Sequence, residues 1–205
     1  MTDLPSGICH LPGYLDSEEQ RALLEEIRAV VAEAPLYTPR MPRTGKPMSV
    51  RMTNCGPLGW ITDKEGGYRY QPTHPDTGKP WADMPPQVLA LWDELTGYPA
   101  PPEACLVNLY EGDARMGLHV DSDEAAWDAP VLSISLGDTA LFRIGGVLRS
   151  DPTRSVRLAS GDVCMLGGAS RRAYHGVDRI VPGSSRLLPK GGRINLTLRR
   201  VTVPG

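Results

Sequence analysis

The second half of the chain alternates apolar and polar residues with a period of two. From Glu103 onward, short stretches of this alternation are separated by turns that contain glycine. Successive side chains of a strand point to opposite faces, so the pattern predicts half-buried β-strands. So many short strands in about 100 residues predict a double-sheet jelly roll or a barrel. The expected strands are 104–110, 116–121, 131–136, 140–144, 155–158, 162–166, 173–178 and 193–200.

Two helices are expected ahead of this β-rich region. Residues 16–34 carry an apolar stripe at helical spacing, with Asp16 as a helix-capping residue and Pro35 as the stop. A shorter helix is expected at about 86–95, with Gly97 as its C-cap. We expect both helices to support one sheet of the core from outside.

Composition indicates one domain that spans residues 1–205. The chain is 40% hydrophobic and 22% charged, which suffices for a single core at this length. The four cysteines are far apart and form no C-x-x-C pair. No apolar run approaches the roughly 18 residues of a membrane span, and no charged and apolar leader is evident. We expect a reduced, cytoplasmic, monomeric protein that has no membrane partner.

Charge is distributed unevenly along the chain. The formal net charge is −2, which excludes a protein whose whole surface binds nucleic acid but leaves a local basic patch open. Residues 36–81 contain seven Lys and Arg against three Asp and Glu, a net of +4, so the remainder carries −6. The same segment holds five of the 12 Trp, Tyr and Phe residues.

A candidate metal site comes from two histidines and a carboxylate. In the predicted strand 116–121, His119 and Asp121 are two residues apart and therefore share a face. His175 follows 54 residues later in another predicted strand. Two histidines and one carboxylate form the facial triad of non-haem Fe(II) oxygenases. The alternative is a surface histidine beside an acid in a turn.

The last predicted strand places polar residues on one face and apolar residues on the other. Buried arginines need anionic partners, and a small dicarboxylate could bind two guanidinium groups bidentately. Asn108 and Tyr110 show the same alternation in strand 104–110. The alternative is an edge strand whose arginines face solvent. The polar face would carry Arg193, Asn195, Thr197 and Arg199.

Several short stretches together carry a family resemblance. They are Met48–Trp60, Lys79-Pro-Trp81, Asn108-x-Tyr110, His119-x-Asp121-x-Asp123-Glu124, Val131–Gly137, Gly145-Gly146, Gly161-Asp162, Tyr174-His175-Gly176 and Arg193-x-Asn195-Leu-Thr197-x-Arg199. As a set they resemble the AlkB family of Fe(II)- and 2-oxoglutarate-dependent dioxygenases. The first stretch resembles the bacterial AlkB type, a DNA repair demethylase.

The resemblance implies an α+β, mainly β protein with a double-stranded β-helix (jelly-roll) core over about 103–200. Fe(II) would be held by His119, Asp121 and His175, with 2-oxoglutarate and O2 as co-substrates. Arg193 would bind the distal carboxylate of 2-oxoglutarate and Arg199 the one nearer the metal. The full 2-oxoglutarate site implied is Asn108, Leu109, Tyr110, Arg193, Asn195, Thr197 and Arg199.

The implied reaction is oxidative demethylation of bases such as 1-methyladenine or 3-methylcytosine in DNA, with release of formaldehyde, succinate and CO2. Residues of about 36–81 would form a nucleotide-recognition lid, with a flipped base stacked on Trp60 and His119 on its other side. Asp123 would favour a cationic base. The substrate-binding residues implied are Met52, Arg51, Trp60, Tyr68, Arg69, Tyr70, Asp123 and Arg149.

Several alternatives stay open at this point. The substrate could be single-stranded DNA, DNA with a flipped base, or RNA, and an oxygenase of the same core could act on protein or a small molecule. A non-catalytic nucleic-acid binding module is a further alternative. The alignment at Tyr68 and Tyr70 could slip by one because of Glu65-Gly66-Gly67, and residues 181–192 match nothing in the family pattern.

Overall fold

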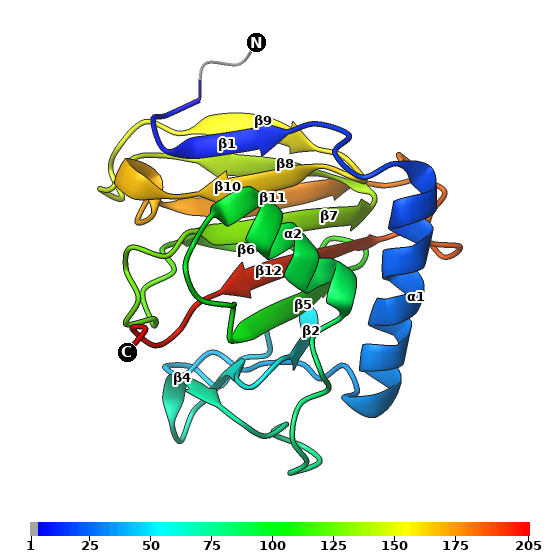
Figure 1. Ribbon diagram of the computed structural model, residues 1–205, viewed down its shortest axis with the longest axis vertical. Coiled ribbons are helices and arrows are strands. Elements are labelled where there is room, and N and C mark those ends of the chain that lie inside the picture. The colour runs from blue at the N-terminus through cyan, green and yellow to red at the C-terminus, as the bar shows by residue number, and fades with distance from the viewer. Residues whose placement is uncertain (1–3) are drawn as a thin grey trace.

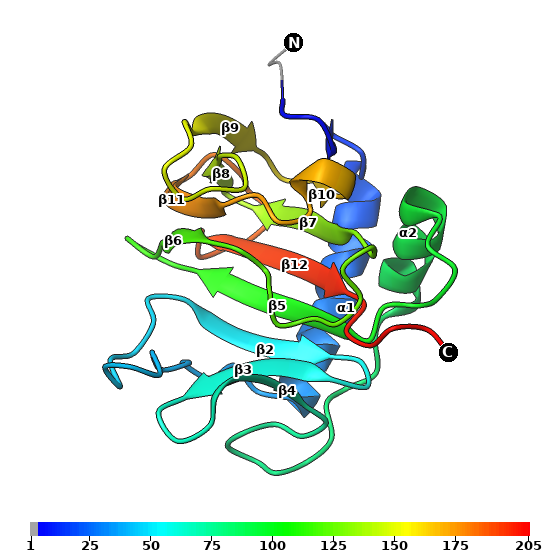
Figure 2. The ribbon, with the colours of Figure 1, turned by 90° about the vertical axis from the view of Figure 1, so that its left-hand side faces the viewer.

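Two β-sheets lie face to face in the computed structural model, which describes residues 4–205 (Figure 1 and Figure 2). The larger sheet consists, in order across it, of β1 (Ile8–Leu11), β10 (Val163–Leu166), β7 (Val131–Gly137), β12 (Arg193–Arg199), β5 (Ala104–Tyr110) and β2 (Arg51–Cys55). The smaller sheet consists of β6 (Met116–His119), β11 (His175–Val181), β8 (Thr139–Ile144) and β9 (Arg154–Leu158). This is the architecture expected of a jelly roll.

The eight strands expected from residue 103 onward are all present as β5 to β12, with shifted ends. Two shifts affect the site. β6 ends at His119 rather than at residue 121, and β11 begins at His175 rather than at residue 173. The strand β1 was not expected. It pairs with β10 at the edge of the larger sheet.

Both expected helices are confirmed. In α1 (Ser17–Glu33), the side chain of Asp16 accepts from the backbone of Glu18 and Glu19, and Glu19 reciprocates to close a capping box. In α2 (Pro86–Thr96), Gly97 ends the helix in the left-handed conformation at φ 59°. The helices pack against the outer face of the larger sheet (Figure 2). No helix among residues 4–205 is long and apolar enough to cross a membrane.

The segment expected to form the lid divides into two parts. β2 belongs to the larger sheet and pairs with β5 in register. The strands β3 (Gly59–Asp63) and β4 (Gly67–Gln71) form a separate two-stranded hairpin beside it. β2 is the edge strand of the larger sheet, and the hairpin contacts this sheet through β2 and β5.

The space between the sheets is lined by both apolar and polar side chains. Tyr110 of β5 packs with Ala140 of β8 and Val177 of β11, so this cluster joins the two sheets. β12 lies between β5 and β7, and the polar side chains of β12 alternate with apolar ones. The inner face of the larger sheet is thus polar where the smaller sheet covers it.

Candidate active site

His119, Asp121 and His175 come together where β6 and β11 are paired. The two histidines are opposite each other in the register of these strands. Nε2 of His119 lies 3.6 Å from Oδ1 of Asp121, and Nε2 of His175 lies 3.5 Å from Oδ2. One potential ligand atom from each residue lies within 4.8 Å of the others. The three side chains therefore form one compact donor set.

Asp121 does not reach this set by strand alternation. Because β6 ends at His119, Asp121 lies in the following loop, and the expected strand 116–121 is too long. The carboxylate is instead held by Arg199, whose Nη2 donates to Oδ1 at 2.6 Å. The contact with Arg199 of β12 therefore positions Asp121 beside the two histidines, and strand alternation does not.

The hydrogen bonds of both imidazoles leave Nε2 available as a ligand. Nδ1 of His119 lies 2.9 Å from the carbonyl oxygen of Gly117, and Nδ1 of His175 lies 2.9 Å from that of Ala173. A carbonyl oxygen only accepts, so each Nδ1 carries the hydrogen and each Nε2 offers its lone pair. Metal-binding histidines are oriented in this manner.

The protonation states also suit a cation. Burial alone would raise the pKa of Asp121, but Arg199 and the two imidazoles outweigh burial and hold that pKa well below its usual range. Loss of solvation and the neighbouring His175 lower the pKa of His119 to about 4, although 38% of its side chain is exposed. Oδ2 of Asp121 is buried and has no hydrogen-bond partner. Neutral imidazoles and an ionised carboxylate are the forms that bind metal.

A buried ionic network surrounds Asp121. Arg199 also donates from Nη1 to Oε1 of Glu124 at 2.9 Å, and Nη2 of Arg171 donates to Oε2 of Glu124 at 3.1 Å. Nη1 of Arg171 donates to the backbone carbonyl of Asp121 at 3.0 Å. All four side chains are almost fully buried. The network fixes both the carboxylate and the backbone of Asp121.

Arg193, at the other end of β12, has different surroundings. Its side chain is 1% exposed, and it donates to the hydroxyl of Ser135 at 2.9 Å and to the carbonyl of Leu158 at 3.2 Å. It forms no ion pair with any residue of the described range 4–205, and its Nε has no partner. Burial lowers its pKa to about 10. A buried cation in this state suits an anionic ligand.

Polar residues of β12 and β5 fill the space between the two arginines. Asn195 donates from Nδ2 to the hydroxyl of Ser133 at 2.7 Å, and the hydroxyl of Thr197 donates to Oδ1 of Asn195 at 3.0 Å. Asn108 is the cross-strand partner of Asn195, and Tyr110 is that of Arg193. Burial raises the pKa of Tyr110 to about 12, so its hydroxyl stays protonated.

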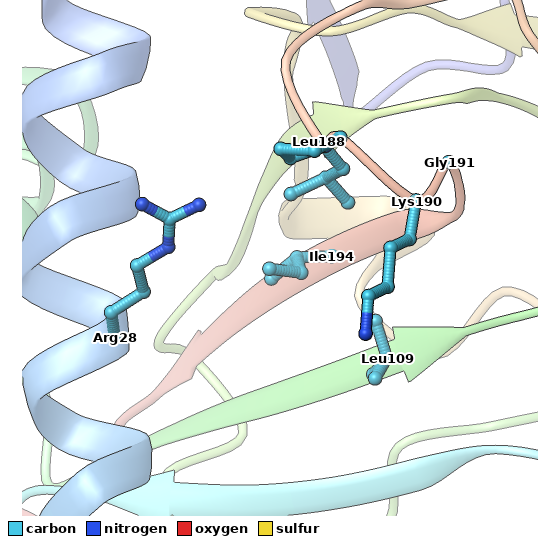
Figure 3. Close-up of a pocket in the computed structure, with 7 residues that line it drawn as sticks. Arg28, Leu109, Leu188, Lys190, Gly191 and Ile194 are labelled. Carbon is cyan, nitrogen blue, oxygen red and sulfur yellow. The ribbon is translucent and has the colours of Figure 1, made fainter.

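Leu109 is separated from these residues. Its side chain lies on the opposite face of β5, together with Ile194 and Leu188, where they line a cavity of about 270 Å³ beside α1 (Figure 3). Arg28 and Lys190 flank this cavity. The side chain of Leu109 therefore does not share the interior with Asn108 and Tyr110, as strand alternation requires.

One face of the β3–β4 hairpin is aromatic and lies against the loop that follows Asp121. Trp60 and Tyr68 stack with ring centroids 5.6 Å apart and an interplanar angle of 21°. Nε1 of Trp60 donates to Oδ2 of Asp123 at 2.7 Å. The hydroxyl of Tyr70 donates to Glu124 and accepts from Arg199. The hairpin thus connects to the network around Asp121.

Other residues expected to bind substrate lie elsewhere. Arg69 is on the opposite face of the hairpin and forms an ion pair with Asp63 at 2.7 Å. Arg51 is exposed and pairs across strands with Leu109, on the outer face. Met52 is 2% exposed and packs in the main core. The structure brings neither Arg69 nor Arg51 to the aromatic face. Met52 is opposite Asn108 in the β2–β5 register and shares its inner face. Trp60 and Tyr70 pack against the same core cluster as Met52.

Arg149 does lie near the triad. Its Nη1 donates to the backbone carbonyl of Leu118 at 3.0 Å, directly before His119. Its guanidinium carbon lies 5.7 Å from the centre of the Tyr174 ring, directly before His175. Arg149 therefore spans the two strands that carry the histidines.

Comparisons with known proteins agree with this geometry. The chain matches the 2OG-Fe(II) oxygenase superfamily over residues 7–199. It is 63% identical over 189 residues to the "Alpha-ketoglutarate-dependent dioxygenase AlkB homolog" of Caulobacter vibrioides, covering 92% of this chain and 85% of that one. The chain belongs to the AlkB family. It is also 42% identical over 182 residues to "Alpha-ketoglutarate-dependent dioxygenase AlkB" of Escherichia coli, covering 87% and 83% of the two chains.

A solved structure supports the same assignment. The solved structure described as "The structure of OsALKBH1" superposes on this AlkB-family chain with a TM-score of 0.81 and 31% sequence identity. The match covers 96% of this chain and 98% of that one. The protein is therefore a dioxygenase that uses Fe(II) and 2-oxoglutarate. The unpartnered Oδ2 of Asp121 and the buried, unpaired Arg193 fit these two groups.

Two residues of this AlkB-family site were missed by sequence reasoning. The sequence pattern does not single out Arg171, and Glu124 enters it only as the last residue of the His119-x-Asp121-x-Asp123-Glu124 stretch. Glu124 is nevertheless 2% exposed and binds Arg199, Arg171 and Tyr70. These partners are 75, 47 and 54 residues away in sequence, so no local pattern could reveal them.

Proposed function

We propose that this AlkB-family protein removes N-methyl groups from alkylated bases in DNA by oxidative demethylation. Bases of the 1-methyladenine and 3-methylcytosine type would release formaldehyde, while 2-oxoglutarate and O2 give succinate and CO2. The observation that carries the proposal is the hydrogen bond from Trp60 to Asp123 at 2.7 Å. It places a flat aromatic ring and a carboxylate together, two residues from Asp121.

The proposed metal ligands are Nε2 of His119, Nε2 of His175 and the carboxylate of Asp121. Bound Fe(II) supplies the oxidation of the methyl C–H bond. The hydrogen bonds from Nδ1 of each imidazole to a backbone carbonyl set the tautomer, so that Nε2 of each ring is free to bind the metal. Arg199 and Arg171 hold Asp121 from its side chain and its backbone, so its orientation does not depend on the metal.

We assign the distal carboxylate of 2-oxoglutarate to Arg193. This guanidinium is buried without an ion pair, whereas Arg199 already contacts two carboxylates. Arg199 lies at the metal end of β12, so the end of 2-oxoglutarate nearer the metal would face it. The remaining polar lining is formed by Asn108, Tyr110, Asn195 and Thr197, with Leu109 contributing no side chain.

The substrate base is proposed to stack on Trp60 within the lid. Stacking of a base on an aromatic ring contributes about 1–3 kcal/mol and tolerates any base. The carboxylate of Asp123 would favour a methylated base that carries a positive charge over its neutral parent. Tyr68, 47% exposed beside Trp60, would line the same opening, and Arg149 would approach it from the β8–β9 connection. Such a site takes a single-stranded or flipped-out base into one monomer.

Formaldehyde release from a methylated oligonucleotide tests the proposal. We expect turnover that requires both Fe(II) and 2-oxoglutarate and that is abolished in His119→Ala. Trp60→Ala should raise KM for the oligonucleotide about 5- to 150-fold, while Trp60→Phe should retain most of the affinity. If His119→Ala turned over normally, the metal assignment would be wrong.

The choice of substrate needs a parallel comparison. We would measure 1-methyladenine and neutral N6-methyladenine in single-stranded DNA, duplex DNA and RNA side by side. Asp123→Asn should reduce the ratio of kcat/KM for the cationic base to kcat/KM for the neutral base about 10- to 150-fold, because a hydrogen bond to a charged group contributes about 1.5–3 kcal/mol. If RNA were turned over faster than DNA with each methylated base, RNA would replace DNA as the proposed substrate.

A further inference from the structure

Trp127 is a large aromatic residue that the proposed function does not use. Its side chain is 41% exposed, whereas Trp81 and Trp92 are 5% and 0% exposed in the core. Trp60, the remaining tryptophan, is assigned to the substrate base. Tryptophan is highly buried on average, and tryptophan and tyrosine are enriched at binding interfaces.

The loop that carries Trp127 is rigidly held. Arg171 donates to the carbonyls of Asp121 and Ala129, which lie at the two ends of this loop. The backbone N–H of Ala125 donates to the carbonyl of Val201 at 2.8 Å. Trp127 is therefore exposed on a fixed support, which lowers the entropic cost of binding a ligand.

Two arginines accompany the ring of Trp127. The guanidinium carbon of Arg172 lies 4.8 Å from the ring centre, and that of Arg171 lies 5.8 Å from it. Arg171 is buried and hydrogen-bonded to the loop that carries Trp127, whereas Arg172 is exposed. The adjacent Asp128 accepts a hydrogen bond from the hydroxyl of Tyr98 at 3.1 Å. A flat ring beside an exposed guanidinium suits a base and its phosphate.

Trp127 lies in the β6–β7 connection, which also carries Asp121 and Asp123. Hydrogen bonds join this connection to the β3–β4 hairpin through Trp60 and to the β10–β11 connection through Arg171 (Figure 1). Trp127 is four residues beyond Asp123, so their Cα atoms are at most about 14 Å apart. Arg172 precedes His175 by three residues. A strand with one base at Trp60 has a neighbouring nucleotide within this reach, since stacked nucleotides repeat every ~3.4 Å.

We infer that Trp127 and Arg172 form a second nucleotide subsite, which binds a nucleotide of the target strand that flanks the methylated one. The flanking base stacks on Trp127 in place of the exposed guanidinium of Arg172, which turns from the ring to pair with the phosphate of that nucleotide. The inference rests on the proposed function, because it takes the substrate to be a nucleic-acid strand. It extends the binding surface beyond the lid, onto the loop that carries Asp121.

Length dependence of turnover tests the subsite. The substrates are a trinucleotide centred on 1-methyladenine and single strands extended on the 5′ side or on the 3′ side. The wild type should gain affinity from extension on one side. In Trp127→Ala this gain should be lost, so KM for the extended strand rises about 5- to 150-fold, the factor equivalent to 1–3 kcal/mol.

Two further variants separate stacking from structural effects. Trp127→Phe keeps a flat ring and should retain most of the gain, whereas Trp127→Leu keeps only apolar bulk and should lose it. Arg172→Gln should reduce the salt slope of log KM by about 1, because one phosphate contact is removed. Arg157→Gln removes an exposed arginine on β9 and serves as the matched charge control.

The subsite is refuted if folded Trp127→Ala and Trp127→Leu keep the wild-type KM on every strand. Failure of the proposed function has a different signature, namely no turnover of any methylated strand by the wild type. In that case, fluorescence anisotropy of a labelled single strand still decides the inference. Equal binding by wild type and Trp127→Leu would overturn it.

Discussion

Arg199 donates to Oδ1 of Asp121 at 2.6 Å, which leaves Oδ2 of that carboxylate buried and without a hydrogen-bond partner. Because Arg199 also binds Glu124, its charge is compensated within the protein. Arg193, on the same face of β12, forms no ion pair with any residue in 4–205. The two arginines of one strand thus have different tasks. Arg199 orients a metal ligand, and Arg193 is available to an exogenous carboxylate.

The variant Arg193→Met should raise KM for 2-oxoglutarate without loss of stability. Removing one partner of a buried charged pair costs about 2 kcal/mol or more, so KM should rise about 30-fold or more. Burying an isolated guanidinium is itself costly, so the free energy of unfolding of the ligand-free variant should be equal or greater. Steady-state kinetics and urea denaturation check both parts. An unchanged KM would remove Arg193 from the 2-oxoglutarate site.

The variant Arg199→Met, in contrast, should lower the free energy of unfolding. It leaves Asp121 and Glu124 buried together with only Arg171 to compensate them. Breaking a buried ion pair by removing one partner costs about 3–5 kcal/mol. Urea denaturation should show this loss in the metal-free protein, while the exposed Arg157→Gln should stay within about 0.5 kcal/mol of the wild type. Equal stability of Arg199→Met and wild type would contradict the network.

The variant Gly176→Ala should weaken metal binding. A Cβ at Gly176 would lie 2.5 Å from the carbonyl oxygen of Met116, so β6 and β11 would have to separate. These strands carry His119 and His175, and forcing extra volume into a packed site costs about 1–3 kcal/mol. The neighbouring Gly117→Ala is a matched control, because its Cβ would meet nothing within 4 Å. Metal titration should separate the two variants, and equal affinities would disprove the prediction.

The Asp63–Arg69 pair predicts a pH dependence in the hairpin. The hydrogen bond from Arg69, and after it the backbone N–H of Gly66, lower the pKa of Asp63. A carboxyl whose pKa is lower in the folded state stabilises that state above its unfolded pKa of about 3.8, and this stability is lost as pH falls through the folded value. Asp63→Asn should therefore be less stable at neutral pH by under about 1 kcal/mol, since the pair is partly exposed.

Thermal unfolding of both proteins from about pH 7 to about pH 3 measures this difference. We expect the difference to be constant down to about pH 5 and to shrink below the unfolded pKa of Asp63. High salt should reduce it, because exposed pairs are screened. A difference that grew on acidification would have the wrong sign for this pair.

Local patterns predicted most of the secondary structure. Alternation over 104–110 and 193–200 gave β5 and β12 with ends correct to within one residue, and the capping residues bounded α1. The strand β1 was missed, since its pairing with β10, 152 or more residues away in sequence, is what makes it a strand. The end of β6 was misplaced for a related reason, since nothing local marks where its pairing with β11 stops.

The sequence by itself determined which side chains share a face on β5 and β12. Its two-residue period on β5 and β12 put Asn108, Tyr110, Arg193 and Arg199 into the interior, because side-chain direction along a strand is a local property. Only the tertiary structure decided which of these charges are compensated. Arg199 meets Asp121 from 78 residues away and Glu124 from 75, whereas no such partner reaches Arg193 within the described chain. Electrostatic compensation depends on neighbours in space, and strand pairing alone creates those.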